Sequence, residues 1–402
     1  MSEKLNKYYA VVPLSLESLF EEELKQLGIT EFKSKKAGCF FTTTTQGMMK
    51  ANLWTRYASR ILLEVGERNY RTEDDIYKFT FSIPWENYFT EKQSIKISLS
   101  AKNCPLKSIN FLTLRVKDAV CDRFRERSGA RPDVEKHNPD IQIFVFVDNQ
   151  KVTLYLDTSG ESLFKRGWRR DKGEAPLKEN LAAGLIGLSG WEPSQPLYDP
   201  FCGSGTIIIE AATIAINMAP GITRRFGFEK FKFFNSEVWQ ALKTEARAAI
   251  NWNVDINLAG SDISTQIIEK ASKNAQLAGL TKLLIERKIK FFPCDAREAR
   301  PTSETPGVII ANPPYGEQSN PKSASVASMM KNVADNLKHN FENWVVWMLT
   351  SDLNLPRQMR LQESRKIVIF NGPLECRFFR FLMIPGSNRR ESKAVKTSSP
   401  KE

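Results

Sequence analysis

The chain has 402 residues, 41% of them hydrophobic, which is enough for two or three hydrophobic cores. Its formal net charge of +12 favours a polyanionic partner such as a nucleic acid. No apolar run approaches the roughly 20 residues that span a bilayer, and the N-terminus lacks the apolar core of a signal peptide. The six cysteines form no Cys-x-x-Cys pair. We therefore expect a cytoplasmic protein with neither a zinc site nor a disulfide framework.

Residues 1–55 show the pattern of a small α+β unit. A strand-like run over 8–12 precedes a helix whose apolar residues recur at helical spacing and which ends near Gly28. Two further strand-like runs, 31–36 and 38–43, follow it.

Residues 56–157 predict a second α+β unit, with helices near 73–82 and 108–127. Its expected strands lie near 61–65, 94–100, 141–147 and 152–156. Between residues 102 and 131 there are eight Lys or Arg against three acids. The basic side of the helix near 108–127 is either exposed to solvent alone or in contact with RNA phosphates. The candidate RNA-binding residues here are Arg115, Lys117, Arg123, Arg125 and Arg127.

Residues 158–178 form a polar, basic connector. A tryptophan interleaved with cations can stack on a base while the cations hold backbone phosphates, although a plain linker would have a similar composition. The candidates for RNA contact are Lys165, Arg166, Trp168, Arg169 and Arg170.

Residues 179–386 alternate between strand and helix patterns, which predicts a doubly wound, mostly parallel sheet. The expected strands are 196–199, 257–261, 289–293, 307–311 and 344–349, with a closing pair at 366–370 and 377–384. The insert 217–253 is longer than a crossover needs, and we expect it to contribute to a substrate wall. The tail, residues 387–402, has the composition of a disordered segment.

A glycine-rich turn joins the first of these strands to an apolar helix. Gly203 and Gly205 allow a ligand close to the backbone, but Ile208 stands where a dinucleotide motif has its third glycine. Asp199 would repel phosphates and attract an ammonium group, so we predict a sulfonium methyl donor, S-adenosylmethionine. Cys202 is expected to pack as a small residue and not to act as a nucleophile. The other candidate donor-binding residues of this turn are Pro200, Phe201 and Thr206.

Two more acids follow expected strands. A carboxylate at Asp262, beside Ile263, can accept hydrogen bonds from ribose hydroxyls. Asp295, beside Ala296, could bind the adenine amino group. Each acid alone could equally be a helix N-cap or a loop carboxylate.

Residues 311–316 read Ala-Asn-Pro-Pro-Tyr-Gly and suit methylation of an exocyclic amine. The Asn312 side-chain oxygen and the Pro313 carbonyl can hold both N–H groups, so that the lone pair of the amine points at the methyl donor. Pro314 stiffens the loop, and Tyr315 offers a flat face for a base lifted from its stack. A Pro-rich turn after a buried strand is the alternative.

Together, the segments 157–187, 199–206 and 219–229 and the Asn-Pro-Pro-Tyr-Gly-Glu stretch resemble the THUMP-domain class I RNA methyltransferases, especially bacterial enzymes that make N2-methylguanosine in large-subunit ribosomal RNA. The resemblance implies an N-terminal ferredoxin-like unit, a THUMP domain over 56–157 and a Rossmann-like methyltransferase domain with a terminal β-hairpin over 179–386. It also places Lys178 and Glu179 beside the methionine end of the donor. This chain departs from the family at two positions: Trp168 stands where the family commonly has Tyr, and Gln318 stands where it commonly has Arg.

We therefore expect direct, in-line methyl transfer from S-adenosylmethionine to the N2 amine of a guanosine in 23S ribosomal RNA, without a metal or a covalent intermediate. Methylation of tRNA is one alternative. An amino-methyltransferase of DNA and a non-catalytic RNA-binding or assembly protein that keeps the cofactor fold are the others.

Overall fold

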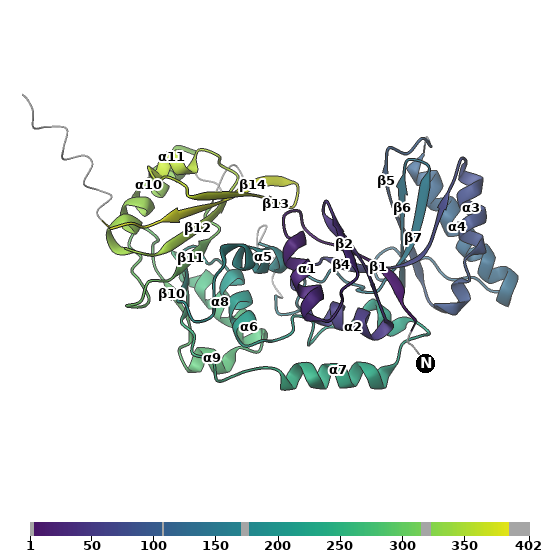
Figure 1. Cartoon of the computed structure of the whole chain (residues 1–402), viewed down its shortest axis with the longest axis horizontal. Helices are drawn as coiled ribbons and strands as arrows, with labels where there is room; N and C mark the ends of the chain where they lie inside the picture. Colours follow the sequence, from purple (N-terminus) through teal and green to yellow (C-terminus); the bar gives the residue numbers. More distant parts are fainter. Residues whose placement is uncertain (1–3, 107, 170–176, 315–322, 386–402) are drawn as a thin grey trace, which may run out of the picture. The chain divides into compact units, whose positions relative to one another are not determined.

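The computed structural model describes residues 4–106, 108–169, 177–314 and 323–385 (Figure 1). The chain divides into two compact units. The N-terminal unit comprises Met1–Arg166 and Ala219–Ile250, and the C-terminal unit comprises Gly167–Met218 and Asn251–Glu402.

The N-terminal unit is built on one seven-stranded sheet with the strand order β2-β3-β1-β4-β7-β6-β5. Its long strand β4 pairs with β1 through residues 60–63 and with β7 through residues 62–69. The two predicted α+β units therefore share a single sheet. The strands and helices are β1 (Asn6–Val11), α1 (Glu17–Gln26), β2 (Phe32–Lys35), β3 (Gly38–Thr43), α2 (Thr45–Trp54), β4 (Arg60–Asn69), α3 (Glu73–Ser82), β5 (Ile95–Lys102), α4 (Ile109–Ser128), β6 (Ile141–Asp148), β7 (Lys151–Asp157) and α7 (Ser236–Ala248).

Local sequence explains where the helices of this unit begin and end. Thr72 caps α3 by accepting the Asp75 N–H at 3.2 Å, and the Asp75 carboxylate accepts the Thr72 N–H at 2.9 Å. Ser108 caps α4, which ends at Gly129 in the left-handed conformation with φ 75°. The predicted helices 73–82 and 108–127 are thus confirmed.

The insert after α6 (Thr206–Ala215) differs from its prediction, because residues 219–250 belong to the N-terminal unit. The backbone N–H of Phe228 donates to the Thr158 carbonyl at 2.9 Å, and that of Gly221 donates to the Leu53 carbonyl at 2.9 Å. The Phe228 ring also packs edge-on against Trp239 at 5.1 Å. The aromatic residues Phe228 and Trp239 of this insert are buried in the core of the N-terminal unit.

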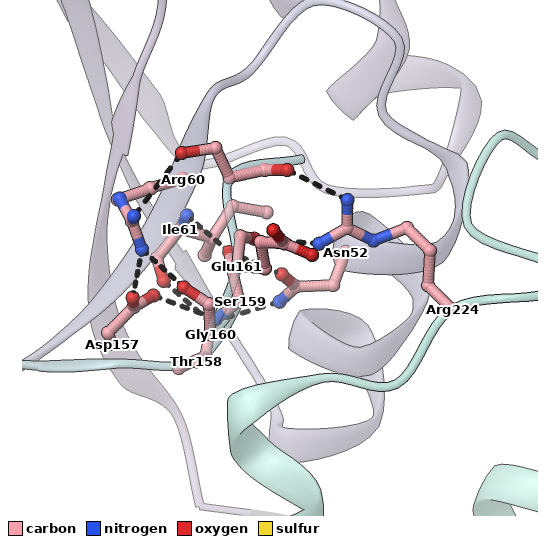
Figure 2. A network of polar contacts seen from close by, with 10 residues as sticks. Asn52, Arg60, Ile61, Asp157, Thr158, Ser159, Gly160, Glu161 and Arg224 are labelled. Atoms are coloured by element: carbon pink, nitrogen blue, oxygen red, sulfur yellow. Dashed lines mark hydrogen bonds and ion pairs between the residues drawn. The ribbon is translucent and has the colours of Figure 1, made fainter. Parts of the chain in front are cut away.

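A polar network anchors the chain just after β7 (Figure 2). Arg60 forms an ion pair with the buried Asp157, and the Ser159 hydroxyl donates to Asn52 Oδ1 at 2.7 Å. From the insert, Arg224 donates to the carbonyl of residue 161 at 2.6 Å. The first half of the predicted connector is therefore a folded loop of the N-terminal unit.

The C-terminal unit has the sheet order β10-β9-β8-β11-β12-β14-β13. The first five strands are parallel, and β14 runs antiparallel to both β12 and β13. This confirms the predicted doubly wound sheet with its closing hairpin. The elements are α5 (Glu179–Ser189), β8 (Leu197–Asp199), α6 (Thr206–Ala215), β9 (Leu258–Asp262), α8 (Thr265–Leu277), α9 (Thr281–Ile285), β10 (Ile289–Pro293), β11 (Val308–Ala311), α10 (Ser323–Asn340), β12 (Val345–Thr350), α11 (Leu355–Met359), β13 (Arg365–Asn371) and β14 (Leu374–Leu382).

One face of this sheet packs against α10 through a buried apolar cluster that includes Tyr198, Phe341 and Val346. The Tyr198 ring stacks on Phe292 and on Phe341, each with ring centroids 6.2 Å apart. Within the described ranges, no helix is long and apolar enough to cross a membrane.

Candidate active site

Four polar residues follow four neighbouring parallel strands. Asp199 ends β8, Asp262 ends β9, Asp295 lies two residues after β10, and Asn312 follows β11 directly. Since the strand order is β10-β9-β8-β11, the carboxyl ends of these strands lie along one edge of the sheet. The structure therefore brings the three predicted motifs to a common edge, where ligands bind in open α/β sheets.

The glycine turn is shaped for close approach. Gly203 and Gly205 have φ of 52° and 85°, and a Cβ on Gly205 would lie 3.0 Å from the Phe291 ring. The Cys202 N–H donates to the Ser261 carbonyl at 2.9 Å, which ties the turn to β9. Burial raises the pKa of the Cys202 thiol, which suits the predicted packing role better than a nucleophilic one.

Asp199 is 1% exposed, and its Oδ1 accepts the Phe201 N–H at 3.0 Å. Burial raises the pKa of this carboxyl to about 8, while the Phe201 N–H lowers it and the neighbouring Asp262 raises it. Asp262 accepts the Ser264 N–H at 3.0 Å in the same manner. Two acids at the ends of adjacent strands form a site that a positively charged ligand would stabilise.

At the next strand end, Asp295 already has a cationic neighbour. The Arg297 guanidinium donates to it, with Nε 3.0 Å from Oδ1, and holds the pKa of Asp295 below its usual range. The sequence motifs did not predict this pairing. Ala296 is buried, whereas the side chain of Ile263 is 71% exposed directly after Asp262. Ile263 therefore presents an apolar surface beside the acids.

Asn336 on α10 supports this strand end and was not predicted from the sequence. It is 8% exposed, and its Nδ2 donates to the carbonyls of Ala296 at 3.2 Å and Ala299 at 2.9 Å. Its Oδ1 accepts from Arg300 at 3.1 Å. No motif marks this residue, because the carbonyls to which it donates lie about forty residues away in sequence.

Asn312 carries an unsatisfied acceptor. Its Oδ1 is buried and accepts no hydrogen bond from the described residues. Leaving such an oxygen unpaired costs free energy, so a hydrogen bond donated to it by a bound group would be stabilising. Pro313 is buried and Pro314 half-buried. Tyr315 and Gln318 lie outside the described residues.

Two connector residues that were predicted to contact RNA are buried in the structure. Arg166 is 4% exposed and donates to the carbonyls of Leu163 at 2.8 Å and Arg56 at 2.7 Å. Trp168 is 5% exposed, so its ring has no free face for a base. Packing removes Arg166 and Trp168 from solvent, which disfavours the RNA contact predicted for them; that contact stays a prediction.

The remaining connector residues divide similarly. Arg169 is directed into the C-terminal unit, where it contacts Thr206 and Glu179. These contacts give Arg169 partners within the protein, and its predicted RNA contact stays a prediction. Lys165 is half-exposed and pairs with Glu161 at 2.5 Å. Arg170 lies outside the described residues. Lys178 directly precedes α5, and Glu179 begins it.

The candidate cations of α4 all have acidic neighbours within their own unit. Arg123 pairs with Glu86 at 2.5 Å with its side chain 11% exposed, and it lowers the pKa of Glu86. Arg125 and Arg127 remain 56% and 57% exposed. The other pairs are Arg115 with Asp74 at 3.0 Å, Lys117 with Asp118 at 2.7 Å, Arg125 with Asp122 at 2.7 Å and Arg127 with Glu86 at 3.7 Å. RNA contact by this helix stays a prediction. Among the described residues there is no cluster of metal-binding side chains.

Comparison with known proteins agrees with this arrangement. Residues 166–380 match the RMKL-like methyltransferase domain, residues 70–157 the THUMP domain, and residues 7–62 the RlmL ferredoxin-like domain. The chain is 36% identical over 390 residues to a ribosomal RNA large subunit methyltransferase K/L of Shewanella baltica and 38% identical over 401 residues to one of Psychromonas ingrahamii. These alignments cover 96% and 98% of this chain. The chain spans about half the length of these relatives, 54% and 52%.

Solved structures with a similar fold cover nearly the whole chain. A possible methylase from Clostridium difficile 630 has a TM-score of 0.84 at 32% identity over 94% of this chain and 98% of its own. A predicted N6-adenine-specific DNA methylase from Listeria monocytogenes has a TM-score of 0.84 at 31% identity, and the match covers 94% of this chain and 96% of its own. The methyltransferase SMU.472, complexed with SAH, has a TM-score of 0.85 at 28% identity, and the match covers 94% of this chain and 98% of its own. Since the domain match runs from the connector into β14 and a THUMP domain precedes it, this chain belongs to the RMKL-like methyltransferases that carry a THUMP domain.

Proposed function

We propose that the protein methylates the N2 exocyclic amine of a guanosine in large-subunit ribosomal RNA, with S-adenosyl-L-methionine as the donor. The observation that carries the proposal is the buried Oδ1 of Asn312, which accepts no hydrogen bond from the described residues, at the same sheet edge as the acids that end β8 and β9. The names of the curated relatives and the THUMP match favour ribosomal RNA over other acceptors. The related structure with bound SAH favours this donor.

The residues of the site fit the donor. Asp199 is a buried carboxyl that a cationic amino group would stabilise, and the space beside Gly203 is open, so that a ligand could approach the backbone there. Asp262 would accept the ribose hydroxyls, and the exposed Ile263 would cover one face of the adenine. The other residues proposed to line the site are Pro200, Phe201, Cys202, Thr206, Lys178, Glu179, Asp295 and Ala296.

When bound, the donor would supply a methyl group on a positively charged sulfonium sulfur; the S–CH3 bond breaks as the N–C bond forms, and the neutral thioether S-adenosyl-L-homocysteine is the leaving group. At the acceptor, Asn312 Oδ1 and the Pro313 carbonyl would hold the two N–H groups of the target amine, so that its lone pair lies in line with the methyl group. The amine proton becomes acidic once the new N–C bond forms and leaves to solvent, so no dedicated base is needed. Pro313 and Pro314 restrict the backbone that holds these acceptors.

The proposal can be tested by incubating the full chain with radiolabelled donor and, in parallel, with deproteinised large-subunit rRNA, tRNA and duplex DNA. Digestion and mass spectrometry would then identify the modified nucleoside. We expect N2-methylguanosine in rRNA, and transfer by Asn312→Ala that is lower on the order of a hundredfold or more. Label in tRNA alone would correct the acceptor. N6-methyladenosine in DNA would instead favour the activity named for the Listeria monocytogenes structure, which is the second candidate. Donor binding without any transfer would favour a non-catalytic RNA-binding role.

A further inference from the structure

We infer that Arg169 is a positioning residue of the donor site, which fixes the start of α6 against the start of α5. The inference rests on the proposed function, because it concerns how the donor-binding turn is held. It is an alternative to the RNA contact that the sequence suggested for this residue.

The guanidinium of Arg169 reaches both helix starts at once. Its Nη2 donates to the Thr206 hydroxyl at 2.5 Å, and Nη1 and Nη2 both lie 3.4 Å from the Leu177 carbonyl. Its Nε lies 3.6 Å from Glu179 Oε1. The side chains of Arg169 and Glu179 are only 11% and 6% exposed, so this contact is inside the unit. A planar guanidinium can bridge acceptors on two segments, which a lysine ammonium does less well.

These contacts fall at the positions that shape the donor-binding turn. Thr206 is the first residue of α6 and directly follows Gly205, whose φ of 85° turns the chain into the helix. Leu177 lies two residues before Glu179, the first residue of α5. Movement of either helix start would displace backbone that the proposed site uses. Arg169 therefore acts through Thr206 and residues 177–179, without needing to touch the donor.

Charge gives a second reason for a cation at this place. Glu179 and Glu210 are 5% and 1% exposed, and both act on Arg169 electrostatically. Burial lowers the pKa of Arg169, and the two acids oppose this by favouring its charged form. Buried acids are costly unless positive charge or hydrogen bonds compensate them. The ring of Trp168 lies 5.1 Å from the guanidinium and helps to keep it away from solvent.

The test is a double-mutant cycle on the full chain. Binding of S-adenosyl-L-homocysteine is measured by calorimetry for the parent, Arg169→Met, Thr206→Val and the double variant, together with Arg169→Lys. We expect Arg169→Met to weaken binding on the order of tenfold or more, the scale for losing hydrogen bonds from a charged group. Arg169→Lys should recover part of the loss. The loss of affinity in the double variant should be smaller than the sum of the two single losses, because Arg169 acts in part through Thr206.

Arg224→Met provides a matched control, since Arg224 is a guanidinium of the N-terminal unit that also donates to backbone carbonyls. It should lower the melting temperature and leave ligand affinity unchanged. The inference is overturned if Arg169→Met and Arg169→Lys both bind the ligand as tightly as the parent does. It is also overturned if the losses of affinity from Arg169→Met and Thr206→Val simply add in the double variant. A parent that does not bind the ligand would overturn the proposed function, and this inference with it.

Discussion

Asp199 and Asp262 end adjacent parallel strands, and each accepts the backbone N–H two residues further on, at 3.0 Å in both cases. The two acids thus share one local geometry and differ in burial, because Asp199 is 1% exposed whereas Asp262 is half-buried. The same turn therefore holds one carboxyl in an apolar setting and leaves the other accessible. This difference predicts distinct behaviour of the two residues.

The first prediction concerns pH. The pKa of Asp199 is raised from 3.8 to about 8, so below pH 8 the carboxyl is mostly protonated in the free protein. An ammonium group needs the ionised form. We expect the affinity for S-adenosyl-L-homocysteine to rise from pH 6 towards pH 8 by up to about tenfold per pH unit, since a shift of one unit corresponds to a tenfold change in equilibrium. Calorimetry across this range would measure it.

Asp199→Asn is the control for this pH dependence. It should bind the ligand weakly and with a flat profile over the same range. In the free parent, a carboxyl with a raised pKa stabilises the fold most at acidic pH, so this contribution to stability should decline as pH rises from about 4 to 8. A parent affinity independent of pH would show that Asp199 is already ionised or does not meet the ammonium group.

The second prediction is that Asp262→Ala weakens donor binding by about 1.5–3 kcal/mol, the range for hydrogen bonds to a charged group. Asp352→Ala is a matched control, because Asp352 follows β12 in the same sheet and accepts the Asn354 N–H at 2.8 Å in the same kind of turn. It should leave affinity unchanged. Equal effects of the two substitutions would mean that Asp262 acts only through its turn.

Much of this edge of the sheet follows from local sequence. Continuous β-branched and apolar runs predict the buried parallel strands. Once the order of the strands is known, the acids at their ends are expected at one edge of the sheet. Helix α2 was not predicted, because it is buried nearly all round and so lacks a clear apolar stripe. The location of residues 219–250 was also wrong, since an aromatic-rich insert does not reveal which core it joins.

The connector shows another limit of sequence reasoning. The alternation of cations with Trp168 is the same whether the side chains face solvent or the interior. Only the structure shows that Arg166 donates to backbone carbonyls within the N-terminal unit and that Arg169 binds Thr206. Long-range partners of this kind leave no local pattern, as the contacts of Asn336 also illustrate.

The third prediction is that Asn312→Ala lowers kcat on the order of a hundredfold or more, while donor affinity changes little. The physical reason is the loss of one preorganised acceptor for the target amine. Asn257 offers a matched control: its Oδ1 is also buried and unpaired among the described residues, but it precedes β9 at the opposite edge of the sheet. Asn257→Ala should retain kcat. Normal turnover by Asn312→Ala would remove the central claim about the acceptor.

The last prediction divides the cations of α4 by exposure. Arg125 and Arg127 are more than half exposed and remain available to phosphates, whereas Arg123 is committed to Glu86 with its side chain 11% exposed. For the full chain, Arg125→Glu combined with Arg127→Glu should weaken RNA binding across sequences. The slope of log Kd against log salt should fall by about 0.7–0.9 for each phosphate that the variant no longer neutralises, because fewer counterions are released on binding.

Arg123→Ala is the comparison that separates charge from structure. Removing its guanidinium leaves Glu86 with the longer contact to Arg127 at 3.7 Å, so the variant should melt at a lower temperature. Its salt slope should match the parent, because Arg123 is not presented to RNA. Filter binding at several salt concentrations and a thermal melt would supply both values. If the Arg125 and Arg127 substitutions leave the slope unchanged, α4 is a solvated face held by its own ion pairs, and the RNA contact lies on another part of the chain.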